Sequence, residues 1–460
     1  MEGCATLQIA ATRRTVNLVF FFGIILFFSF ASLLATNAAF IVTDTIYNGV
    51  TIGNIPVGGL SIPEAKNVLL TSYNNRVATS SITVTYQNQT RTITPQEIDL
   101  SIDADALATQ AYTIGRSGNI IKILQERYLA VNGGYSIPFA KNYNSDKLYT
   151  LLAKMATVID RSPQNARLYD HDNLLQVVPE VWGQEVDIKA SVANLTTVLD
   201  TAILFTSELT VKELPPSILS SDLATIDSLL ATYSTQFDPN NKNRYQNVAI
   251  AAKKINNTLV HPGEVFSFNQ AVGLRLPEFG YKEAPVLVDG KLLLDWGGGV
   301  CQVSTTLYNA TLLADMSIEE RTSHFQPPSY VPLGQDAAVA DNLLDFKFKN
   351  VSSHNIYITS EVFNDQLTVS IYGKKIPNLP EIHIETVPKT IGYRTIIKQD
   401  SSLPVGREIV EAEGRTGFEV TTSRVKLTNG QEISREVLSA DEFRAEDRVI
   451  RIGTNPQRSK

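Results

Sequence analysis

A run of three glycines that leads into a cysteine constrains this chain more than any other stretch. Residues 297–308 read GGGVCQVSTTLY and include Cys301, one of only two cysteines. Glycine accepts positive φ angles and lets the backbone approach other groups closely. Downstream, apolar side chains recur at positions 303, 307, 310, 313 and 316, which is the spacing of a helix face. We therefore predict a helix over 302–316 with Cys301 at its N-terminus, where unpaired N–H groups and the helix dipole favour a thiolate.

A nucleophilic cysteine needs a base within hydrogen-bond range and a third group that orients this base. Of the five histidines, His324 is the best candidate, because it follows the predicted helix on a segment that we expect to be a strand beside the helix start. The candidate orienting acids lie downstream: Asp336, Asp341 and Asp345. This order resembles transglutaminase-like and papain-like thiol enzymes in arrangement alone. A structural role for Cys301 stays open beside catalysis, because a single cysteine is commonly a small buried apolar side chain.

Residues near Cys301 are candidates for binding a substrate. A developing oxyanion needs fixed hydrogen-bond donors, and we expect them from Gln302 or from backbone N–H groups around Gly298 and Gly299. His261 is a competing base and a further candidate for binding. A zinc site needs three or four close ligands, and no CxxC or HExxH motif occurs, so we expect neither a metal nor another cofactor.

Two larger side chains have two interpretations each. Trp296 either stacks on a sugar ring or packs against the adjacent glycine run. Arg321 either clamps a carboxylate or a substrate, or forms a local ion pair with Glu319 or Glu320. The sequence leaves both choices open.

The N-terminal part has the pattern of a membrane anchor. An apolar run covers 16–42 and follows Arg13 and Arg14, and about 20 apolar residues span a bilayer. Basic residues ahead of such a run keep that side in the cytoplasm. We therefore predict a single-pass protein of the cell membrane, with residues 1–15 cytoplasmic and the remainder extracytoplasmic. The alternative is a cleaved signal peptide with its cleavage site near residues 38–39.

The composition is that of a globular protein with several domains. The 460 residues are 43% hydrophobic and 19% charged, and this length suffices for two to four domains. A net charge of −7 argues against nucleic acid as the main partner. Cys4 and Cys301 lie on opposite sides of the predicted anchor, so no disulfide is expected, and so few cysteines favour a bacterial exported protein.

The region after the anchor contains an internal similarity. Residues 96–107 resemble residues 184–195 at an offset of 88 positions. Each match follows an alternating stretch and leads into a helical pattern, so we predict two small α+β repeats at about 46–130 and 131–215. Chance similarity of two short segments is the alternative.

Local patterns predict further elements. Ser61 with Glu64 is a capping box at the start of a helix over 61–70. Helices are also expected over 220–233 and 245–255. Strands with period-2 alternation are expected over 346–350, 356–362 and 367–372. The fold class is thus an α+β multidomain ectodomain behind one transmembrane helix, ending in a β-rich module.

The block at 220–373 closely resembles the VanW family. Its most specific word is GGGVCQVST, and the other shared words are YST at 233–235, NVAIAA at 247–252, HPGEVFSFN at 261–269, ERTSH at 320–324 and DAAV at 336–339. His324 is followed by Phe325 where the family word ends in His-Ser, and family members tend to have a glycine near Ala314. The resemblance implies a VanW domain in this block and a protein of the bacterial cell envelope.

Both flanks resemble modules that accompany such domains. Residues 46–213 look like a peptidoglycan-binding domain that often precedes VanW, and residues 384–454 look like a G-five domain, with LPVG, EGRTG, TNG and IRIGT as its words. The resemblance implies binding to peptidoglycan or its amino-sugar strands, support of wall maintenance or modification, and a link to glycopeptide resistance. It implies no reaction. The alternative function is a cysteine-dependent peptidoglycan amidase, peptidase or transpeptidase that uses Cys301 and His324.

Overall fold

The structure, a computed structural model, describes residues 19–29, 44–77, 81–139, 141–171, 174–201, 205–288 and 291–456. Its contacts divide the chain into two compact units, which are described separately. The first comprises Met1–Ser162 and Gly183–Leu214, and the second comprises Pro163–Trp182 and Pro215–Lys460.

Residues 19–29 form a helix and are the described part of the predicted anchor. The rest of that anchor, 16–18 and 30–42, lies outside the described residues, as does Cys4. Within the described ranges, no helix is both long enough and apolar enough to cross a bilayer.

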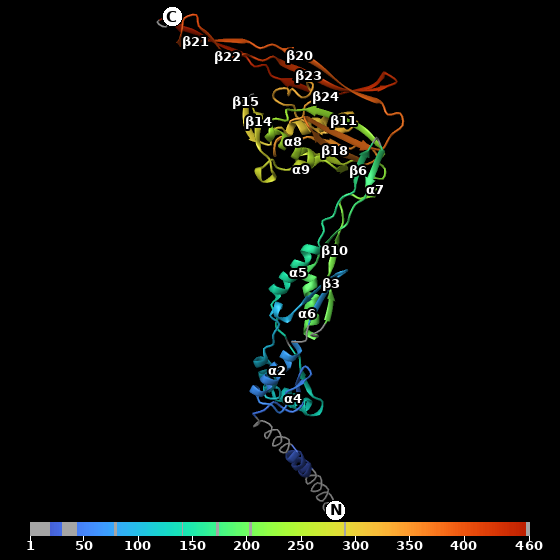
Figure 1. Cartoon of the computed structure of the whole chain (residues 1–460), viewed down its shortest axis with the longest axis vertical. Coiled ribbons are helices and arrows are strands. Elements are labelled where there is room, and N and C mark those ends of the chain that lie inside the picture. Colours follow the sequence, from blue (N-terminus) through green and yellow to red (C-terminus); the bar gives the residue numbers. More distant parts are fainter. Residues whose placement is uncertain are drawn as a thin grey trace, which may run out of the picture. The chain divides into compact units, whose positions relative to one another are not determined.

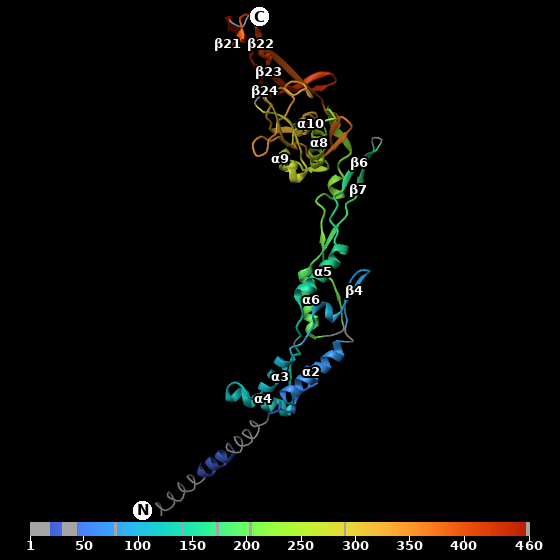
Figure 2. The ribbon, with the colours of Figure 1, turned by 60° about the vertical axis from the view of Figure 1, so that its left-hand side comes forward.

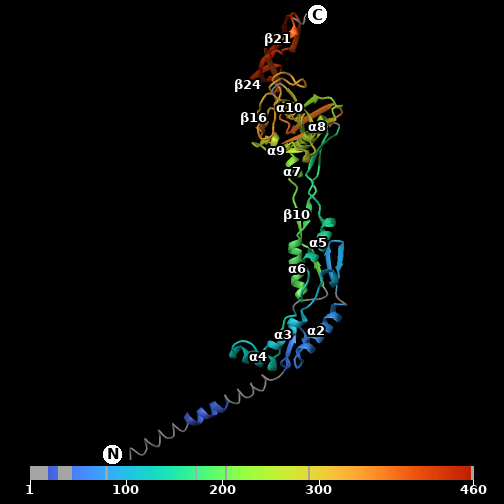
Figure 3. The same cartoon turned by 90° about the vertical axis from the view of Figure 1, so that its left-hand side faces the viewer.

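The first unit has two hydrophobic cores. In the first core, the three-stranded sheet β2-β1-β5 packs with three helices. These elements are β1 (Val50–Ile52), β2 (Ile55–Pro56), α2 (Ile62–Val77), α3 (Ala104–Thr113), α4 (Ile120–Asn132) and β5 (Tyr135–Ile137). Figures 2 and 3 show α3 between α2 and α4. The Ser61 N–H and hydroxyl both donate to the Glu64 carboxylate, at 2.9 and 2.7 Å, which confirms the predicted capping box.

The second core lies under the sheet β4-β3-β9 and the pair β8-β10. Its elements are β3 (Ile82–Tyr86), β4 (Gln89–Ile93), η1 (Pro95–Ile98), α5 (Ser145–Ile159), β8 (Gly183–Val186), α6 (Ile188–Thr201), β9 (Phe205–Glu208) and β10 (Val211–Leu214). This core combines residues from both predicted repeats. The two similar segments do lead into α3 and α6, while the duplication itself stays a prediction.

A four-stranded antiparallel sheet, β11-β19-β18-β12, forms the centre of the second unit. Helices α8 and α10 contact each other and lie against this sheet (Figure 2). The elements are β11 (Ser228–Gln236), α8 (Lys242–Ile255), β12 (Thr258–Val260), α10 (Val300–Leu313), β18 (Ile356–Phe363) and β19 (Gln366–Gly373). The two helices and strands β18 and β19 confirm the corresponding predictions.

One predicted helix is wrong. Of residues 220–233, only Ser220–Leu223 are helical (α7), and Ser228–Gln236 form β11. Strand β11 pairs with β19 over its whole length. These non-local hydrogen bonds outweigh the local helical pattern.

Smaller elements surround this centre. They are β6 (Arg167–His171) paired with β7 (Leu174–Val178), β13 (Val265–Ser267), α9 (Phe268–Val272), η2 (Pro277–Phe279), the hairpin β14 (Glu283–Val288) and β15 (Lys291–Trp296), β16 (Ser317–Glu320) and β17 (Lys347–Lys349). The segment 321–346 between β16 and β17 contains no helix or named strand. It carries His324, so the prediction that this histidine lies on a strand is wrong, because the strand ends at Glu320.

The C-terminal part is a β-rich domain of two three-stranded sheets, β20-β23-β24 and β21-β25-β22. Figure 1 shows the long strands of the first sheet side by side. The strands are β20 (Glu381–Ile391), β21 (Thr395–Pro404), β22 (Glu408–Ala412), β23 (Gly417–Thr428), β24 (Gln431–Phe443) and β25 (Arg448–Asn455). The described fold is therefore the predicted mixed α+β architecture with a β-rich C-terminal module.

Candidate functional site

Cys301 lies in the first turn of α10, where the glycine run ends. Gly299 is the N-cap residue, with a φ of 108°. A Cβ atom on Gly298 would lie 2.6 Å from the Ala284 carbonyl oxygen of β14. Conformation and space therefore both require glycine here. Cys301 is partly buried as a residue, and burial of its thiol opposes the charged form.

Cys301 and His324 interact electrostatically, each shifting the pKa of the other towards its charged form, and His324 is hydrogen-bonded to Asp336. His324 Nδ1 lies 2.6 Å from Asp336 Oδ2, and the same oxygen accepts the His324 backbone N–H at 2.6 Å. The side chains of His324 and Asp336 are 20% and 1% exposed. Because the carboxylate holds Nδ1, Nε2 is left for the thiol. This is the order of contacts that a nucleophile, a base and an orienting acid require.

The electrostatics of the three groups favour an ion pair. Burial raises the pKa of the Cys301 thiol, but His324, a backbone N–H and a nearby arginine outweigh burial and lower this pKa below its ordinary value. Burial lowers the pKa of His324, but its hydrogen bonds to Asp336 and Cys301 and their charges raise it to about 9. Burial raises the pKa of Asp336, and interactions with His324 reverse this and lower it. At neutral pH the site therefore favours thiolate, imidazolium and carboxylate.

Three further residues around Cys301 were not recognised from the sequence. The Val339 N–H lies 3.5 Å from the Cys301 sulfur, which is 3.3 Å from the Val339 carbonyl oxygen. The charge of Arg275, whose side chain is 7% exposed, also stabilises the thiolate. Burial and the charge of Cys301 raise the pKa of Tyr330, whose hydroxyl is bonded to Thr305. Val339 ends the family word DAAV, whereas Arg275 and Tyr330 belong to no motif, and only the tertiary contacts place all three near the thiol.

Of the three candidate acids, only Asp336 contacts His324. Asp341 accepts the backbone N–H of Arg275 at 3.0 Å and forms an ion pair with its guanidinium. Asp345 accepts two hydrogen bonds from residues at the start of α9. The prediction of Asp341 as an orienting residue is therefore wrong, because its carboxylate is already paired with Arg275.

The competing base, His261, lies on the exposed turn between β12 and β13. Its Nδ1 is 3.1 Å from the side-chain oxygen of Asn355. Among the described residues, His324 interacts with Cys301, whereas no interaction between His261 and Cys301 is seen. The geometry thus places His324, and not His261, beside the thiol.

The side chain of Gln302 is fully engaged within the fold. Its amide nitrogen donates to Thr235 Oγ1 and to the Gln236 carbonyl, both at 2.9 Å, and its oxygen accepts Arg244 Nη2 at 2.9 Å. Gln302 is 0% exposed. The prediction that its amide serves an oxyanion is therefore wrong, because the amide joins α10 to β11 and α8.

The backbone at the start of α10 offers another donor. The N–H groups of Val300 and Gln302 are bonded to the carbonyls of Gly297 and Gly299, whereas the described part of the chain provides no acceptor for the Cys301 N–H. A free N–H on the nucleophilic residue itself is suited to an oxyanion.

Arg321 is a carboxylate clamp and does not form the local ion pair. Its Nε donates to the Asp336 carbonyl at 2.6 Å, its Nη2 lies 3.1 Å from Asp336 Oδ1, and its Nη1 lies 2.5 Å from Asp441 Oδ1. Glu320 pairs instead with Lys347 at 2.7 Å. Trp296 ends β15 and is 40% exposed, so its stacking on a sugar stays a prediction.

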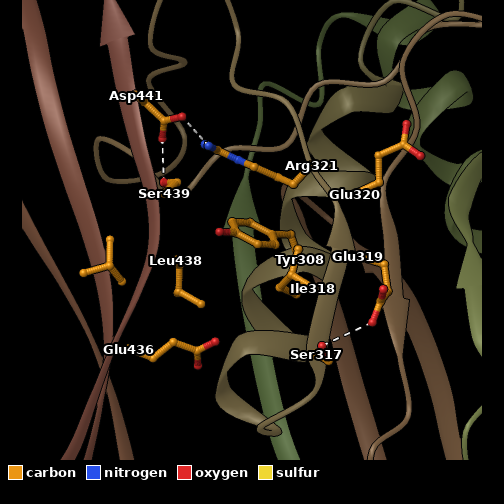
Figure 4. Close-up of a pocket in the computed structure, with 11 residues that line it drawn as sticks. Tyr308, Ser317, Ile318, Glu319, Glu320, Arg321, Glu436, Leu438, Ser439 and Asp441 are labelled. Carbon is orange, nitrogen blue, oxygen red and sulfur yellow. Dashed lines mark hydrogen bonds and ion pairs between the residues drawn. The ribbon is translucent and has the colours of Figure 1, made fainter.

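A pocket of about 290 Å³ lies between α10, β16 and β24 (Figure 4). Tyr308, Arg321 and Asp441 are among its lining residues, and Cys301, His324 and Asp336 are not. The pocket is therefore distinct from the space around the thiol. Among the residues that the structure describes, no group of three or more His, Cys, Asp or Glu side chains is placed to hold a metal ion.

Three family models match successive parts of the chain. Residues 91–203 match the model described as "Putative peptidoglycan binding domain", residues 243–372 match VanW like protein, and residues 382–455 match the G5 domain. The thiol, imidazole and carboxylate of the candidate site all lie in the second of these ranges. Together the three matches define a cell-wall-associated protein.

Two relatives are similar over most of their own length. YoaR, an uncharacterized protein of Bacillus subtilis (strain 168), is 33% identical over 264 residues, 55% of this chain and 85% of the relative. The vancomycin B-type resistance protein VanW of Enterococcus faecalis (strain ATCC 700802 / V583) is 31% identical over 217 residues, 44% of this chain and 76% of the relative. The chain belongs to the VanW family. Among solved structures, an IgA1 protease G5 domain is 30% identical, covering 17% of this chain and 96% of that one, with a TM-score of 0.15.

Proposed function

We propose that this protein is a cysteine-dependent acyl-transfer enzyme that acts on peptide or amide bonds of peptidoglycan. The observation that carries the proposal is the series Cys301, His324 and Asp336. His324 is hydrogen-bonded to Asp336, the thiol pKa is lowered by His324, and the imidazole pKa is raised to about 9. A structural cysteine needs neither a charged histidine nor a buried acid. A purely packing role for Cys301 therefore leaves this arrangement without a purpose.

In the first half of the reaction, the Cys301 thiolate attacks the carbonyl carbon and a carbon–sulfur bond forms. The carbonyl π electrons move to oxygen, and the resulting oxyanion accepts the free backbone N–H of Cys301. When the tetrahedral intermediate collapses, the carbon–nitrogen bond breaks and the leaving amine takes a proton from the His324 imidazolium. The products are a neutral imidazole, a free amine and a thioester on Cys301.

In the second half, neutral His324 removes a proton from the attacking nucleophile. Attack by water releases a carboxylic acid, and attack by an amine forms a new amide bond. In both cases the sulfur leaves as a thiolate and His324 is again an imidazolium, so the starting ion pair returns. Hydrolysis defines an amidase or peptidase, and attack by an amine defines a transpeptidase.

The substrate class is supported by the domains on either side of the site. The VanW-like part lies between a match to a peptidoglycan-binding domain and a match to a G5 domain. Domains that bind the wall would keep wall peptides close to the site and so favour a reaction on them. The apolar N-terminal run behind Arg13 and Arg14 supports a single-pass anchor in a bacterial cell membrane with the other domains outside. Similarity to a relative named as a vancomycin B-type resistance protein supports a role in glycopeptide resistance.

The test is incubation of the purified full chain with defined muropeptides, followed by mass analysis. The wild type is expected to produce a mass change that Cys301→Ala and His324→Ala both abolish. The matched control is His261→Asn, which removes the other candidate base and should keep full activity. If the wild type and Cys301→Ala both give the same product profile as buffer alone, the proposed enzymatic activity is refuted.

The second candidate function is wall binding without chemistry, and the match over residues 91–203 favours it. Sedimentation with insoluble peptidoglycan tests it in the Cys301→Ala full chain, which separates binding from turnover. Deletion of residues 46–162 and 183–213, which leaves Pro163–Trp182 of the second unit in place, is expected to abolish sedimentation. Unchanged sedimentation of the deletion variant would contradict a binding role of that region.

A further inference from the structure

We propose that the β-rich C-terminal domain completes the Cys301 site, with Asp441 of β24 as a positioning residue that acts through Arg321 on Asp336. The inference rests on the proposed thiol chemistry and concerns what holds the orienting acid in place. It assigns to this domain a role inside the site, beyond binding to the wall.

The need for such support comes from the segment that carries the site. His324 and Asp336 both lie in residues 321–346, which form no helix or named strand. No regular ladder of backbone hydrogen bonds therefore fixes their positions. A catalytic constellation must hold its side chains within a fraction of an ångström, so other contacts have to fix this segment.

Arg321 is the first of these contacts. It binds Asp336 through both its carbonyl and its carboxylate, at 2.6 and 3.1 Å. It also reaches across to Asp441 Oδ1 at 2.5 Å, as Figure 4 shows. The side chains of Arg321, Asp336 and Asp441 are 5%, 1% and 9% exposed. The guanidinium is thus enclosed between two carboxylates from two domains.

Two more contacts hold the same segment to the β-rich domain. Thr422 of β23 donates its hydroxyl to the Gly334 carbonyl at 3.1 Å, and this carbonyl also accepts Arg321 Nη2 at 3.3 Å. The buried side chain of Gln326, two residues after His324, is bonded to both Glu446 and Arg415. The segment is therefore held at 321, 326 and 334, which flank both His324 and Asp336.

The charge of Asp441 has a defined effect on His324. Arg321 shares its positive charge between Asp336 and Asp441, so loss of Asp441 directs that charge fully to Asp336. Asp336 then stabilises the imidazolium of His324 less. Removal of a negative charge from the neighbourhood acts in the same direction. Both effects lower the pKa of His324 and weaken its ion pair with Cys301.

The test compares the full-length wild type with Asp441→Asn, which keeps the shape of the side chain, and Asp441→Ala. The matched control is Lys426→Met, because Lys426 of β23 forms a 2.5 Å ion pair with Asp315 after α10. That pair also joins the two domains, but it does not touch residues 321–346. The probe is iodoacetamide between pH 5 and 10, with the peptide that bears Cys301 quantified by mass spectrometry.

In the wild type, the upper inflection of the alkylation profile should reflect the His324 pKa of about 9. In Asp441→Asn it should move down by roughly 0.5–1 pH unit, and in Lys426→Met it should stay. With muropeptides, Asp441→Ala should lower kcat about tenfold, as loss of an outer-shell partner does, and leave KM unchanged. If Asp441→Ala does not fold, as judged by circular dichroism, the isosteric Asp441→Asn decides.

An Asp441→Asn profile that coincides with that of the wild type would overturn the inference. An equal shift in Lys426→Met would also overturn it, because domain docking in general and not Asp441 would then be the cause. Absence of turnover in the wild type refutes the proposed enzyme, while the alkylation profile still decides the role of Asp441. The two failures are therefore distinguishable.

Discussion

Replacing Asp336 with asparagine keeps the size of the side chain and removes its charge. Asp336 Oδ2 accepts two hydrogen bonds from His324, and Oδ1 accepts one from Arg321. An asparagine has one acceptor oxygen and one amide donor. Whichever way it turns, its amide donor faces a donor of either His324 or Arg321. Asp336→Asn therefore removes the negative charge that pairs with His324 and Arg321, and its side chain cannot accept hydrogen bonds from both of these residues.

The size of the effect follows from the pKa of His324. This pKa is about 9 against an ordinary 6.5, and a difference of about 2.5 units corresponds to roughly 3 kcal/mol. Asp336 and the Cys301 thiolate are the two anions that provide this stabilisation. Burial of the imidazole opposes them, so if they contribute equally, loss of Asp336 lowers the His324 pKa by about one unit or more. The equilibrium between the ion pair and the neutral thiol–imidazole pair then shifts about tenfold towards the neutral pair.

Alkylation of Cys301 by iodoacetamide measures this change without any substrate. In Asp336→Asn, the rate at pH 7 should fall, by at most about tenfold, and the upper inflection should move down by about one pH unit. Activity towards muropeptides should fall by about a hundredfold or more, since the base also loses its orientation. Asp345→Asn, from the same segment, is the control and should alkylate like the wild type. An unchanged or faster alkylation in Asp336→Asn would refute an ion pair of Cys301 and His324 that Asp336 supports.

The same raised pKa makes stability depend on pH. Because the folded pKa of His324 lies above its unfolded value, its stabilising contribution is fully present below about pH 6.5 and is lost as the pH rises through about 9. In Asp336→Asn this loss should begin at lower pH. Apparent melting temperatures between pH 6 and 10 report it for both proteins.

Two further substitutions test the packing that places the thiol. Gly298→Ala puts a methyl group 2.6 Å from the Ala284 carbonyl oxygen, so we expect a destabilisation of about 1–3 kcal/mol, measured as a lower thermal midpoint. The control, Gly392→Ala, meets nothing within 4 Å and should leave the midpoint unchanged. Equal midpoints for both variants would contradict the close approach. Gln302→Leu removes all three hydrogen bonds of a fully buried amide, so we expect a loss of about 1–3 kcal/mol in urea unfolding. Leucine in place of the exposed Gln270 is the control. If Gln302→Leu unfolds at the same urea concentration as the wild type, the amide does not join α10 to its neighbours.

Local sequence was sufficient to place Cys301. The helical period of the apolar residues predicted α10, and the glycines predicted a start that only glycine can adopt. The structure has α10 at Val300–Leu313, with Cys301 in its first turn. Both signals depend on neighbours within a few residues, which is why the sequence was sufficient.

The side chains that surround Cys301 are brought there by long-range contacts that no local sequence pattern encodes. Three aspartates follow His324 at similar distances along the chain, and only the fold of residues 321–346 selects Asp336. Gln302, adjacent to the cysteine, was expected at the oxyanion, but its amide is used by β11 and α8. Arg275 and Tyr330 come from segments far from Cys301 in sequence and belong to no motif. Each of these errors concerns a side chain whose partner is far away in the chain.

This difference has a consequence for how the site forms. The thiol is positioned by a helix start, which the VanW-like part of the chain builds from its own neighbours. The base and the acid are positioned by an irregular segment that Arg321, Gln326 and Gly334 attach to the β-rich domain. The chain on either side of Asp336 is also hydrogen-bonded to α10, through Asn309 and Thr305. Since the cost of ordering an irregular segment must be offset by tertiary contacts, loosening of the β-rich domain should first release the part of the segment that carries His324. The fold of α10 would then persist while the pKa of Cys301 rises, so thiol reactivity should be lost before helical structure when the chain is progressively destabilised.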